Sequence, residues 1–240
     1  MQRLYKYFLD GVPEYLARYY WWAYLWSVGA WFFDHQTIIN AVLFGQYRNL
    51  MEGTLKLLKA RAPGRMLQLA CVYGKLTPEL ASTLQIARLH LADISTLQLN
   101  ISRSKVANGA LAPVRMNAEA LAYRDGAFDT LLIFFLLHEM PGEARRNTLS
   151  EAMRVISDRG HIIITEYGQS PRKNLLYRFP VSRWVLGRLE PFLPGFWGEE
   201  LEGSLIEAAS LHNKRVNRVN DAVPVFNGFY RIAEYEVLGA

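Results

Sequence analysis

The sequence lacks several features by which common classes of protein are recognised. It contains a single cysteine, Cys71, so it forms neither an internal disulfide nor a Cys-x-x-Cys site, and we expect a reducing compartment. It also lacks any run of five or more Lys and Arg residues, although the formal net charge is +5. This spread of basic residues predicts no nucleic-acid partner and better suits an anionic membrane surface.

Long apolar runs are missing as well. The longest stretch without charge, residues 19–33, has fifteen residues, whereas a helix that spans a bilayer needs roughly 20. The stretch does not resemble a signal peptide, because no small-residue cleavage site follows a plain aliphatic core.

Aromatic side chains are concentrated near the N-terminus. Ten lie in nineteen residues: Tyr15, Tyr19, Tyr20, Trp21, Trp22, Tyr24, Trp26, Trp31, Phe32 and Phe33. Because Tyr and Trp prefer the membrane–water interface, the segment predicts an interfacial anchor or an entrance for an apolar substrate. A helical lid packed on the domain is an equally open interpretation. We predict an aromatic-rich helical extension over residues 1–62 and a main domain over residues 63–240.

From residue 66 onward, apolar runs of strand length alternate with helical patterns. The predicted strands are residues 66–72, 86–92, 114–116, 130–137 and 161–165, and the predicted helices are residues 78–84, 95–108, 143–156 and 199–211. Runs without polar alternation indicate strands covered on both faces, as in a parallel sheet. Residues 214–225 and 230–238 look like an antiparallel hairpin. The fold class is therefore α/β, with a doubly wound, mostly parallel sheet and a C-terminal hairpin.

The stretch from Arg65 to Thr77 predicts a strand, a sharp turn at Gly74 and the start of a helix. Thr77 suits the N-cap position and Pro78 the first helical position. Free N–H groups at such a helix start point towards a ligand, so these are the parts of a nucleotide pocket.

This stretch resembles the first signature of class I S-adenosylmethionine methyltransferases, in which an acidic residue precedes a Gly-x-Gly-x-Gly loop. Only the last glycine, Gly74, is present here. Gln68 stands at the acidic position, Ala70 and Val72 at the other two glycine positions, and Tyr73 fills the loop. The resemblance implies a Rossmann-like fold and S-adenosylmethionine as cofactor.

Polar residues follow the ends of the predicted strands, where the chemistry of α/β sheets is usually found. Asp93 follows the second strand and is suited to hold ribose hydroxyls, or else to cap the next helix. The resemblance implies that Asn117 holds the adenine amine, and Glu119 is a carboxylate near the pocket or an exposed one. His138 and Glu139 end the fourth strand, and the histidine suits a base or metal ligand.

Two further predictions concern the substrate side and a metal. Tyr167 follows the fifth strand and is a second candidate for contact with the substrate. Asp93, Glu119, His138, Glu139 and Glu166 offer the oxygen and nitrogen ligands that manganese or magnesium takes, although no fixed-spacing metal motif is present.

The substituted loop, the aromatic N-terminus with Asp34-His35, the Gly45-Gln46-Tyr47 segment and residues 134–140 together resemble the rhodoquinone biosynthesis enzymes. This resemblance implies that S-adenosylmethionine donates its amino nitrogen and that ubiquinone exchanges a ring methoxy group for an amino group. It also implies Mn²⁺, a role in anaerobic respiration, and a cytoplasmic location at the inner membrane surface. The oligomeric state stays open.

The resemblance implies roles for individual residues. The catalytic set is Tyr73, His138, Glu139 and Tyr167, and the metal set is Asp93, Glu119 and His138. The cofactor-binding set is Gln68, Ala70, Tyr73, Gly74, Leu76, Thr77, Asp93, Ile94, Asn117, Ala118, Glu119 and Phe135. Two alternatives remain: a methyltransferase acting on a quinone or other apolar small molecule, and a non-catalytic membrane-bound binding protein.

Overall fold

The computed structural model describes residues 10–84, 87–107, 109–220 and 222–239. These residues form an eight-stranded sheet in the order β3-β2-β1-β4-β5-β8-β6, with β7 paired to β8. The strands are β1 (Met66–Leu69), β2 (Leu89–Asp93), β3 (Leu111–Arg115), β4 (Phe128–Phe134), β5 (Ile156–Tyr167), β6 (Lys214–Arg218), β7 (Val223–Val225) and β8 (Tyr230–Gly239). Strands β1 to β5 pair in parallel, and β8 pairs antiparallel with β5, β6 and β7. The predicted fold class is confirmed.

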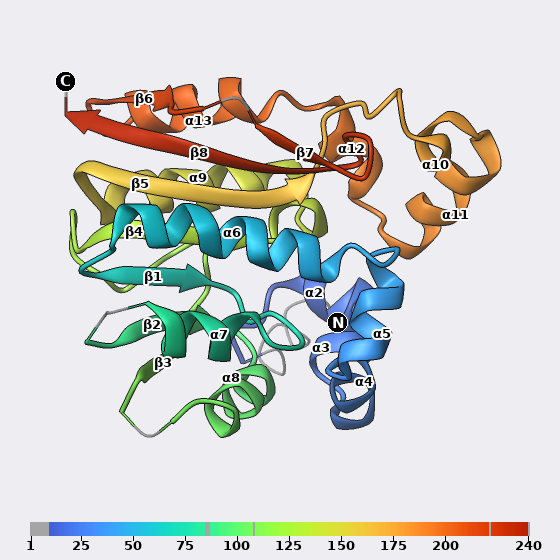
Figure 1. Ribbon diagram of the computed structural model, residues 1–240, viewed down its shortest axis with the longest axis horizontal. Coiled ribbons are helices and arrows are strands. Elements are labelled where there is room, and N and C mark those ends of the chain that lie inside the picture. Colours follow the sequence, from blue (N-terminus) through green and yellow to red (C-terminus); the bar gives the residue numbers. More distant parts are fainter. Residues whose placement is uncertain (1–9, 85–86, 108, 221, 240) are drawn as a thin grey trace.

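Helices cover both faces of this sheet, with α6 in front and α9 behind in Figure 1. The helices of the main layers are α6 (Tyr47–Arg61), α7 (Leu76–Thr83), α8 (Thr96–Ser104), α9 (Gly142–Val155) and α13 (Leu201–Ser210). Burial on both faces explains the unbroken apolar runs, since Leu131, Leu132 and Ile133 of β4 are all fully buried.

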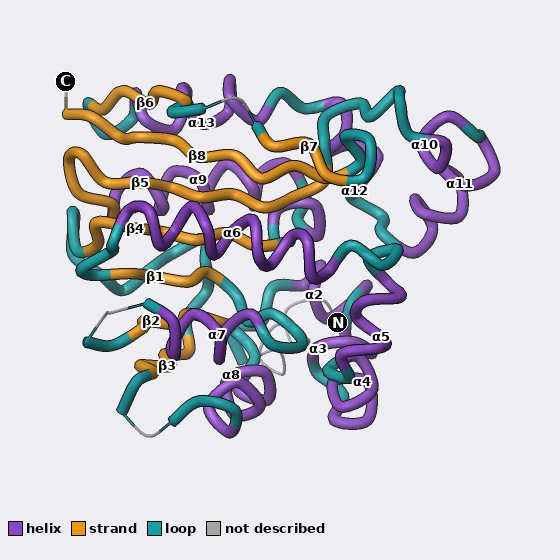
Figure 2. Tube along the Cα trace, viewed as in Figure 1, coloured by secondary structure: helices purple, strands orange, loops and turns teal. Residues whose placement is uncertain are grey.

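Short helices gather at the end of the sheet towards which the parallel strands point, on the right of Figures 1 and 2. Those from the N-terminal segment are α2 (Glu14–Tyr19), α3 (Trp21–Tyr24), α4 (Ser27–Phe33) and α5 (Gln36–Val42). Those from the second half are η1 (Leu137–Glu139), α10 (Leu175–Arg178), α11 (Pro180–Leu189) and α12 (Leu193–Gly198). The aromatic segment is therefore helical and lies over the carboxyl end of the sheet, while the domain boundary at residue 62 stays a prediction.

Several element boundaries differ from those predicted. Strand β1 ends at Leu69, because Ala70 adopts a left-handed conformation with φ +67°. Strand β4 ends at Phe134 for the same reason, since Phe135 has φ +54° and a 3₁₀ turn follows. The predicted strand start at residue 86 and helix end at residue 108 lie outside the described residues.

The conformation of Ala70 leads to a prediction about stability. Left-handed backbone costs an L-residue roughly 1–2 kcal/mol that glycine does not incur. Because glycine also loses more chain entropy on folding, we expect Ala70→Gly to stabilise the fold by a net amount of about 0.5–1 kcal/mol. Urea unfolding measures this difference. The matched control is Ala92→Gly in β2, where the backbone is not left-handed and destabilisation is expected; destabilisation by Ala70→Gly would contradict the argument.

Candidate active site

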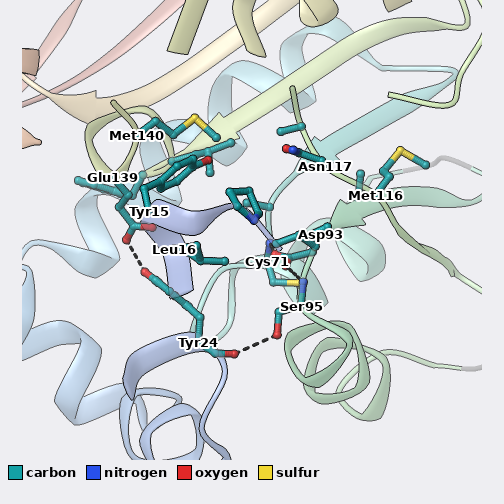
Figure 3. Close-up of a pocket in the computed structure, with 17 residues that line it drawn as sticks. Tyr15, Leu16, Tyr24, Cys71, Asp93, Ser95, Met116, Asn117, Glu139 and Met140 are labelled. Carbon is teal, nitrogen blue, oxygen red and sulfur yellow. Dashed lines mark hydrogen bonds between the residues drawn. The ribbon is translucent and has the colours of Figure 1, made fainter. Parts of the chain in front are cut away.

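A cleft of about 670 Å³ opens at the carboxyl ends of β1, β2 and β4. Six of the predicted cofactor-binding residues line it, namely Ala70, Asp93, Ile94, Asn117, Ala118 and Phe135. Glu139 from the predicted catalytic set lines it as well. Figure 3 shows Asp93 and Asn117 on one side of this cleft and Glu139 on another, with Tyr15 and Leu16 of α2 across it. The cleft is thus bounded partly by the sheet and partly by the N-terminal segment.

Asp93 fixes two turns beside the cleft. One carboxylate oxygen accepts the backbone N–H of Cys71 at 2.7 Å, and the other accepts that of Ser95 at 2.7 Å. Burial raises the pKa of Asp93, and these N–H groups oppose that rise. The side chain of Ser95, and not that of Asp93, caps α8 by accepting the N–H of Gln98 at 3.3 Å. Asp93 thus lines the cleft while its two oxygens hold the backbone at Cys71 and Ser95.

The loop between β1 and α7 is organised differently from the prediction. The Tyr47 hydroxyl, reaching over from α6, accepts the N–H groups of Lys75 at 2.8 Å and Leu76 at 2.9 Å. Thr77 is not the N-cap, because α7 already begins at Leu76 and the Thr77 hydroxyl donates to Gln68 at 3.2 Å. The N–H groups of Lys75 and Leu76 at the start of α7 are therefore satisfied inside the protein and are not presented to a ligand.

Four predicted cofactor-binding residues are buried and do not line the cleft: Gln68, Gly74, Leu76 and Thr77. The amide of Gln68 donates to the Ala70 carbonyl at 3.0 Å and to Thr77 at 3.1 Å, so it points inward. Gly74 has φ +80°, and an added Cβ would lie 2.9 Å from the Tyr47 hydroxyl. These residues shape the turn through contacts inside the protein.

A second cavity of about 800 Å³ adjoins the first. Tyr24, Cys71, Phe135 and Glu139 line both cavities. The remaining walls of the second are largely aromatic and aliphatic. They come from the N-terminal helices, the start of α6, the substituted loop, the ends of β4 and β5, η1 and the end of α11: Tyr20, Trp22, Ala23, Phe33, Ile39, Val42, Leu43, Tyr47, Val72, Tyr73, Phe134, His138, Tyr167 and Glu190. All four predicted catalytic residues, Tyr73, His138, Glu139 and Tyr167, thus line this second cavity.

Three glutamate side chains surround the buried His138 ring at this cavity. Glu166 holds the ring through Nδ1, with its two carboxylate oxygens at 3.1 and 3.0 Å. The opposite ring nitrogen, Nε2, lies 4.0 Å from a carboxylate oxygen of Glu139 and 4.0 Å from one of Glu190. The ring is therefore oriented by one carboxylate so that Nε2 faces two others.

This crowding of charge shifts the pKa values of all four groups. Burial by itself lowers the pKa of His138, but the charges of Glu166, Glu190 and Glu139 outweigh it and raise that pKa to about 9. Burial raises the pKa of Glu139 to about 8 and also raises that of Glu190. Burial acts on Glu166 in the same direction, yet contact with His138 and the N–H groups around it brings its pKa below the ordinary value.

Tyrosines of the N-terminal helices complete the group. The Tyr20 hydroxyl donates to Glu190 at 2.9 Å, and the Tyr24 hydroxyl donates to Glu139. The Tyr24 ring stacks on that of Tyr73 at 5.6 Å between centroids, and Tyr73 donates to the Ala23 carbonyl. The aromatic segment thus contributes hydrogen bonds to the acidic group as well as apolar surface.

The arrangement of His138, Glu139 and Glu190 suits a metal ion. Their ligand atoms lie within 4.8 Å of one another, and within the described residues no other group of His, Cys, Asp and Glu meets this condition. One imidazole and two carboxylates form a donor set that Mn²⁺ accepts, and Glu166 orients the histidine as an outer carboxylate does in metal sites. The structure does not bring the predicted partners Asp93 and Glu119 into this group, and Glu119 accepts a hydrogen bond from Asn147 at 3.3 Å.

Sequence reasoning missed Glu190, Tyr20 and Tyr24 as site residues. Glu190 is the only acidic residue between residues 167 and 198, and a lone acid in a basic, apolar segment was the signal available. The two tyrosines carried no individual signal, because they are two of ten aromatics in the same segment.

Known proteins support the same fold. A methyltransferase domain family matches residues 66–160, and solved methyltransferases share the architecture. The methyltransferase domain of bacterial CtHen1-C has a TM-score of 0.58 at 13% identity, covering 79% of this chain and 97% of that one. NodS, the N-methyltransferase from Bradyrhizobium japonicum WM9, solved with S-adenosyl-L-homocysteine, has a TM-score of 0.54 at 12% identity, covering 79% and 86%. The chain is methyltransferase-like.

Curated relatives are enzymes of quinone biosynthesis. The ubiquinone/menaquinone biosynthesis C-methyltransferase UbiE of Erwinia tasmaniensis is 30% identical over 52% of this methyltransferase-like chain and 51% of its own length. The demethylmenaquinone methyltransferase of Lactiplantibacillus plantarum is 26% identical over 75% and 76%. The chain therefore spans about half the length of the Erwinia enzyme.

Proposed function

We propose that this methyltransferase-like chain is an S-adenosylmethionine-using transferase that acts on a quinone ring. The observation that carries the proposal is the pair of adjoining cavities, one at the strand ends and one lined by aromatics, which share Tyr24 and Glu139. The cofactor lies in the first, with Asp93 near its ribose and Asn117 near its adenine. The quinone ring lies in the second, against the ring of Tyr73 and near His138.

Methyl transfer is the first candidate reaction. It is supported by the names of the curated relatives, which are C-methyltransferases of ubiquinone and menaquinone biosynthesis. In this reaction the cluster of His138, Glu139 and Glu190 at the second cavity takes up the proton released from the substrate. Positioning and proton transfer by the protein's own groups are sufficient for this chemistry.

Replacement of a ubiquinone methoxy group by an amino group, giving rhodoquinone, is the second candidate. The specific observation that favours it is the buried group of His138, Glu139 and Glu190 at the junction of the cavities. A methyl transfer has no need of three carboxylates around one histidine. The altered loop, with Ala70 in place of glycine and Gln68 turned inward, also suits a different placement of the cofactor's methionine end.

The bonds in this second reaction can be balanced. The cofactor's amino nitrogen forms a bond to the ring carbon, and the methoxy group leaves that carbon as methanol. The cofactor's Cα–N bond is then cleaved with water, leaving a 2-oxo acid, and the quinone ring takes up the two electrons. When bound at His138, Glu139 and Glu190, Mn²⁺ would supply a Lewis acid for the quinone carbonyl. Tyr20 and Tyr24 hold the two glutamates in place.

The test uses the purified chain with a short-tailed ubiquinone, S-adenosylmethionine and Mn²⁺, with products identified by mass spectrometry. An aminoquinone establishes the second candidate, and a methylated quinone with S-adenosylhomocysteine establishes the first. Asp93→Ala serves as the cofactor-site variant and is expected to lose product in either case. Absence of both products and of cofactor binding would instead support a non-catalytic binding protein.

The metal assignment makes a separate prediction that needs no turnover. Removing one of three ligands should weaken the site strongly, so we expect Glu190→Gln to lower Mn²⁺ affinity by at least about tenfold. Electron paramagnetic resonance of free Mn²⁺ measures the affinity directly. Glu119→Gln is the matched control, since Glu119 lies outside the group. Equal affinities for the parent and Glu190→Gln would remove Glu190 from the site.

A further inference from the structure

The surface of α10 and α11 carries large apolar side chains that nothing in the described chain covers. No residue of either helix is fully buried. Phe179 and Leu175 are each 61% exposed, Trp184 is 67% exposed and Val181 is 73% exposed. Soluble surfaces rarely gather aromatic and aliphatic side chains in this way unless the patch contacts something.

The charge of this surface has one sign. Residues 170–189 contain five basic residues and no acidic one: Arg172, Lys173, Arg178, Arg183 and Arg188. All five are exposed. Basic side chains interspersed with Trp, Phe and Leu on a short helix are typical of segments that lie in the headgroup region of a membrane.

The patch continues into the N-terminal helices. The Tyr19 ring packs against Phe192 at 5.4 Å, and Tyr20 donates to Glu190, so α2 and α3 adjoin the end of α11. Exposed indoles follow on α3 and α4, with Trp21 at 51% and Trp31 at 62%. Figure 1 places α10, α11 and α3–α5 at the same end of the molecule.

We propose that α10 and α11, together with α3 and α4, form a docking surface for an anionic phospholipid bilayer. None of the helices in the described part of the chain is both long enough and apolar enough to cross a membrane, so the contact is with the surface of the bilayer. The second cavity is lined by residues of α3 and α5 and by Glu190 at the end of α11. The docking surface and the wall of the second cavity therefore share α3 and the end of α11, so an apolar substrate held in that cavity lies beside the bilayer.

Charge decides between a membrane and a second copy of the chain as the occupant. A symmetric dimer through this surface would place the five basic residues of one copy against the same five of the other. An anionic bilayer offers the complementary sign, and each Lys or Arg near such a surface strengthens binding by roughly fivefold.

The experiment measures sedimentation of the full chain with vesicles of phosphatidylglycerol and phosphatidylcholine, compared with vesicles of phosphatidylcholine alone. We expect binding to the anionic vesicles that weakens as salt is raised. The combined change Arg178→Glu, Arg183→Glu and Arg188→Glu should lower the partition coefficient by roughly 100-fold or more. The pair Phe179→Ser and Trp184→Ser should lower it by about tenfold or more, because bound apolar area is lost.

The matched control has the same net charge. Arg88→Glu, Arg124→Glu and Arg159→Glu alter three exposed arginines away from α10 and α11 and should leave much of the binding in place. Equal losses in both triple variants would show that net charge alone attracts the chain to lipid and would overturn the proposal.

A parent chain that is dimeric, and becomes monomeric only in the α10–α11 variants, would assign the surface to self-association. Vesicle binding requires no turnover, so this result is separate from that of the proposed reaction.

Discussion

Replacing His138 by asparagine is expected to lower product formation by about 10²- to 10⁴-fold, the range that a positioned proton-transfer group contributes. The asparagine amide nitrogen takes the place of Nδ1 and keeps a donor for Glu166, which accepts it at about 3 Å in the parent. What is lost is Nε2, the atom that faces Glu139 and Glu190. The loss is expected for either candidate reaction, since both place the quinone ring next to this nitrogen.

Two measurements separate chemistry from folding in this variant. Product formation is followed by mass spectrometry, and cofactor affinity by calorimetry, which should change little because His138 does not line the cofactor cleft. His161→Asn is the matched control: it lies in β5 beside Glu234, outside both cavities. If His138→Asn keeps more than about a tenth of parental product formation, the ring has no role in proton transfer or metal binding.

The fold could be predicted because its signals are local. Runs such as residues 130–137 without polar alternation indicate strands covered on both faces, and the structure has them at the centre of the sheet. The C-terminal hairpin followed from two strand-like runs joined by a turn, although β8 also pairs with β5. The ends of β1 and β4 could not be predicted, because Ala70 and Phe135 are not residues that usually adopt positive φ.

The candidate site could be predicted only in part, because its contacts join residues far apart in the chain. Residues at strand ends, such as Asp93 and His138, were found because sheet topology brings strand ends together. Glu190 lies 52 residues after His138, and Tyr20 lies 170 residues before Glu190. Such contacts depend on how α3 and α11 pack over the sheet, which no local pattern specifies.

Removing the hydroxyl of Tyr47 should be the most damaging change to the loop that begins with Ala70. This single oxygen accepts two N–H groups at the start of α7 and donates to the Tyr73 carbonyl at 3.0 Å. Tyr47 is fully buried, so water cannot replace the hydroxyl without rearrangement. A buried donor left without a partner costs about 1–3 kcal/mol. We therefore expect Tyr47→Phe to lower the free energy of unfolding by roughly 2–4 kcal/mol.

The same variant tests how the loop is built, because its ring still fills the core. Tyr235→Phe is the matched control: Tyr235 is also buried, and it lies in β8, away from the loop between β1 and α7. A change of less than about 0.5 kcal/mol is expected there, as for positions without a special interaction. Urea unfolding of both variants gives the comparison. Similar losses in the two would mean that Tyr47 acts through packing and that the N–H groups of Lys75 and Leu76 find other acceptors. A large loss confined to Tyr47→Phe would instead show that this hydroxyl holds the N–H groups at the start of α7.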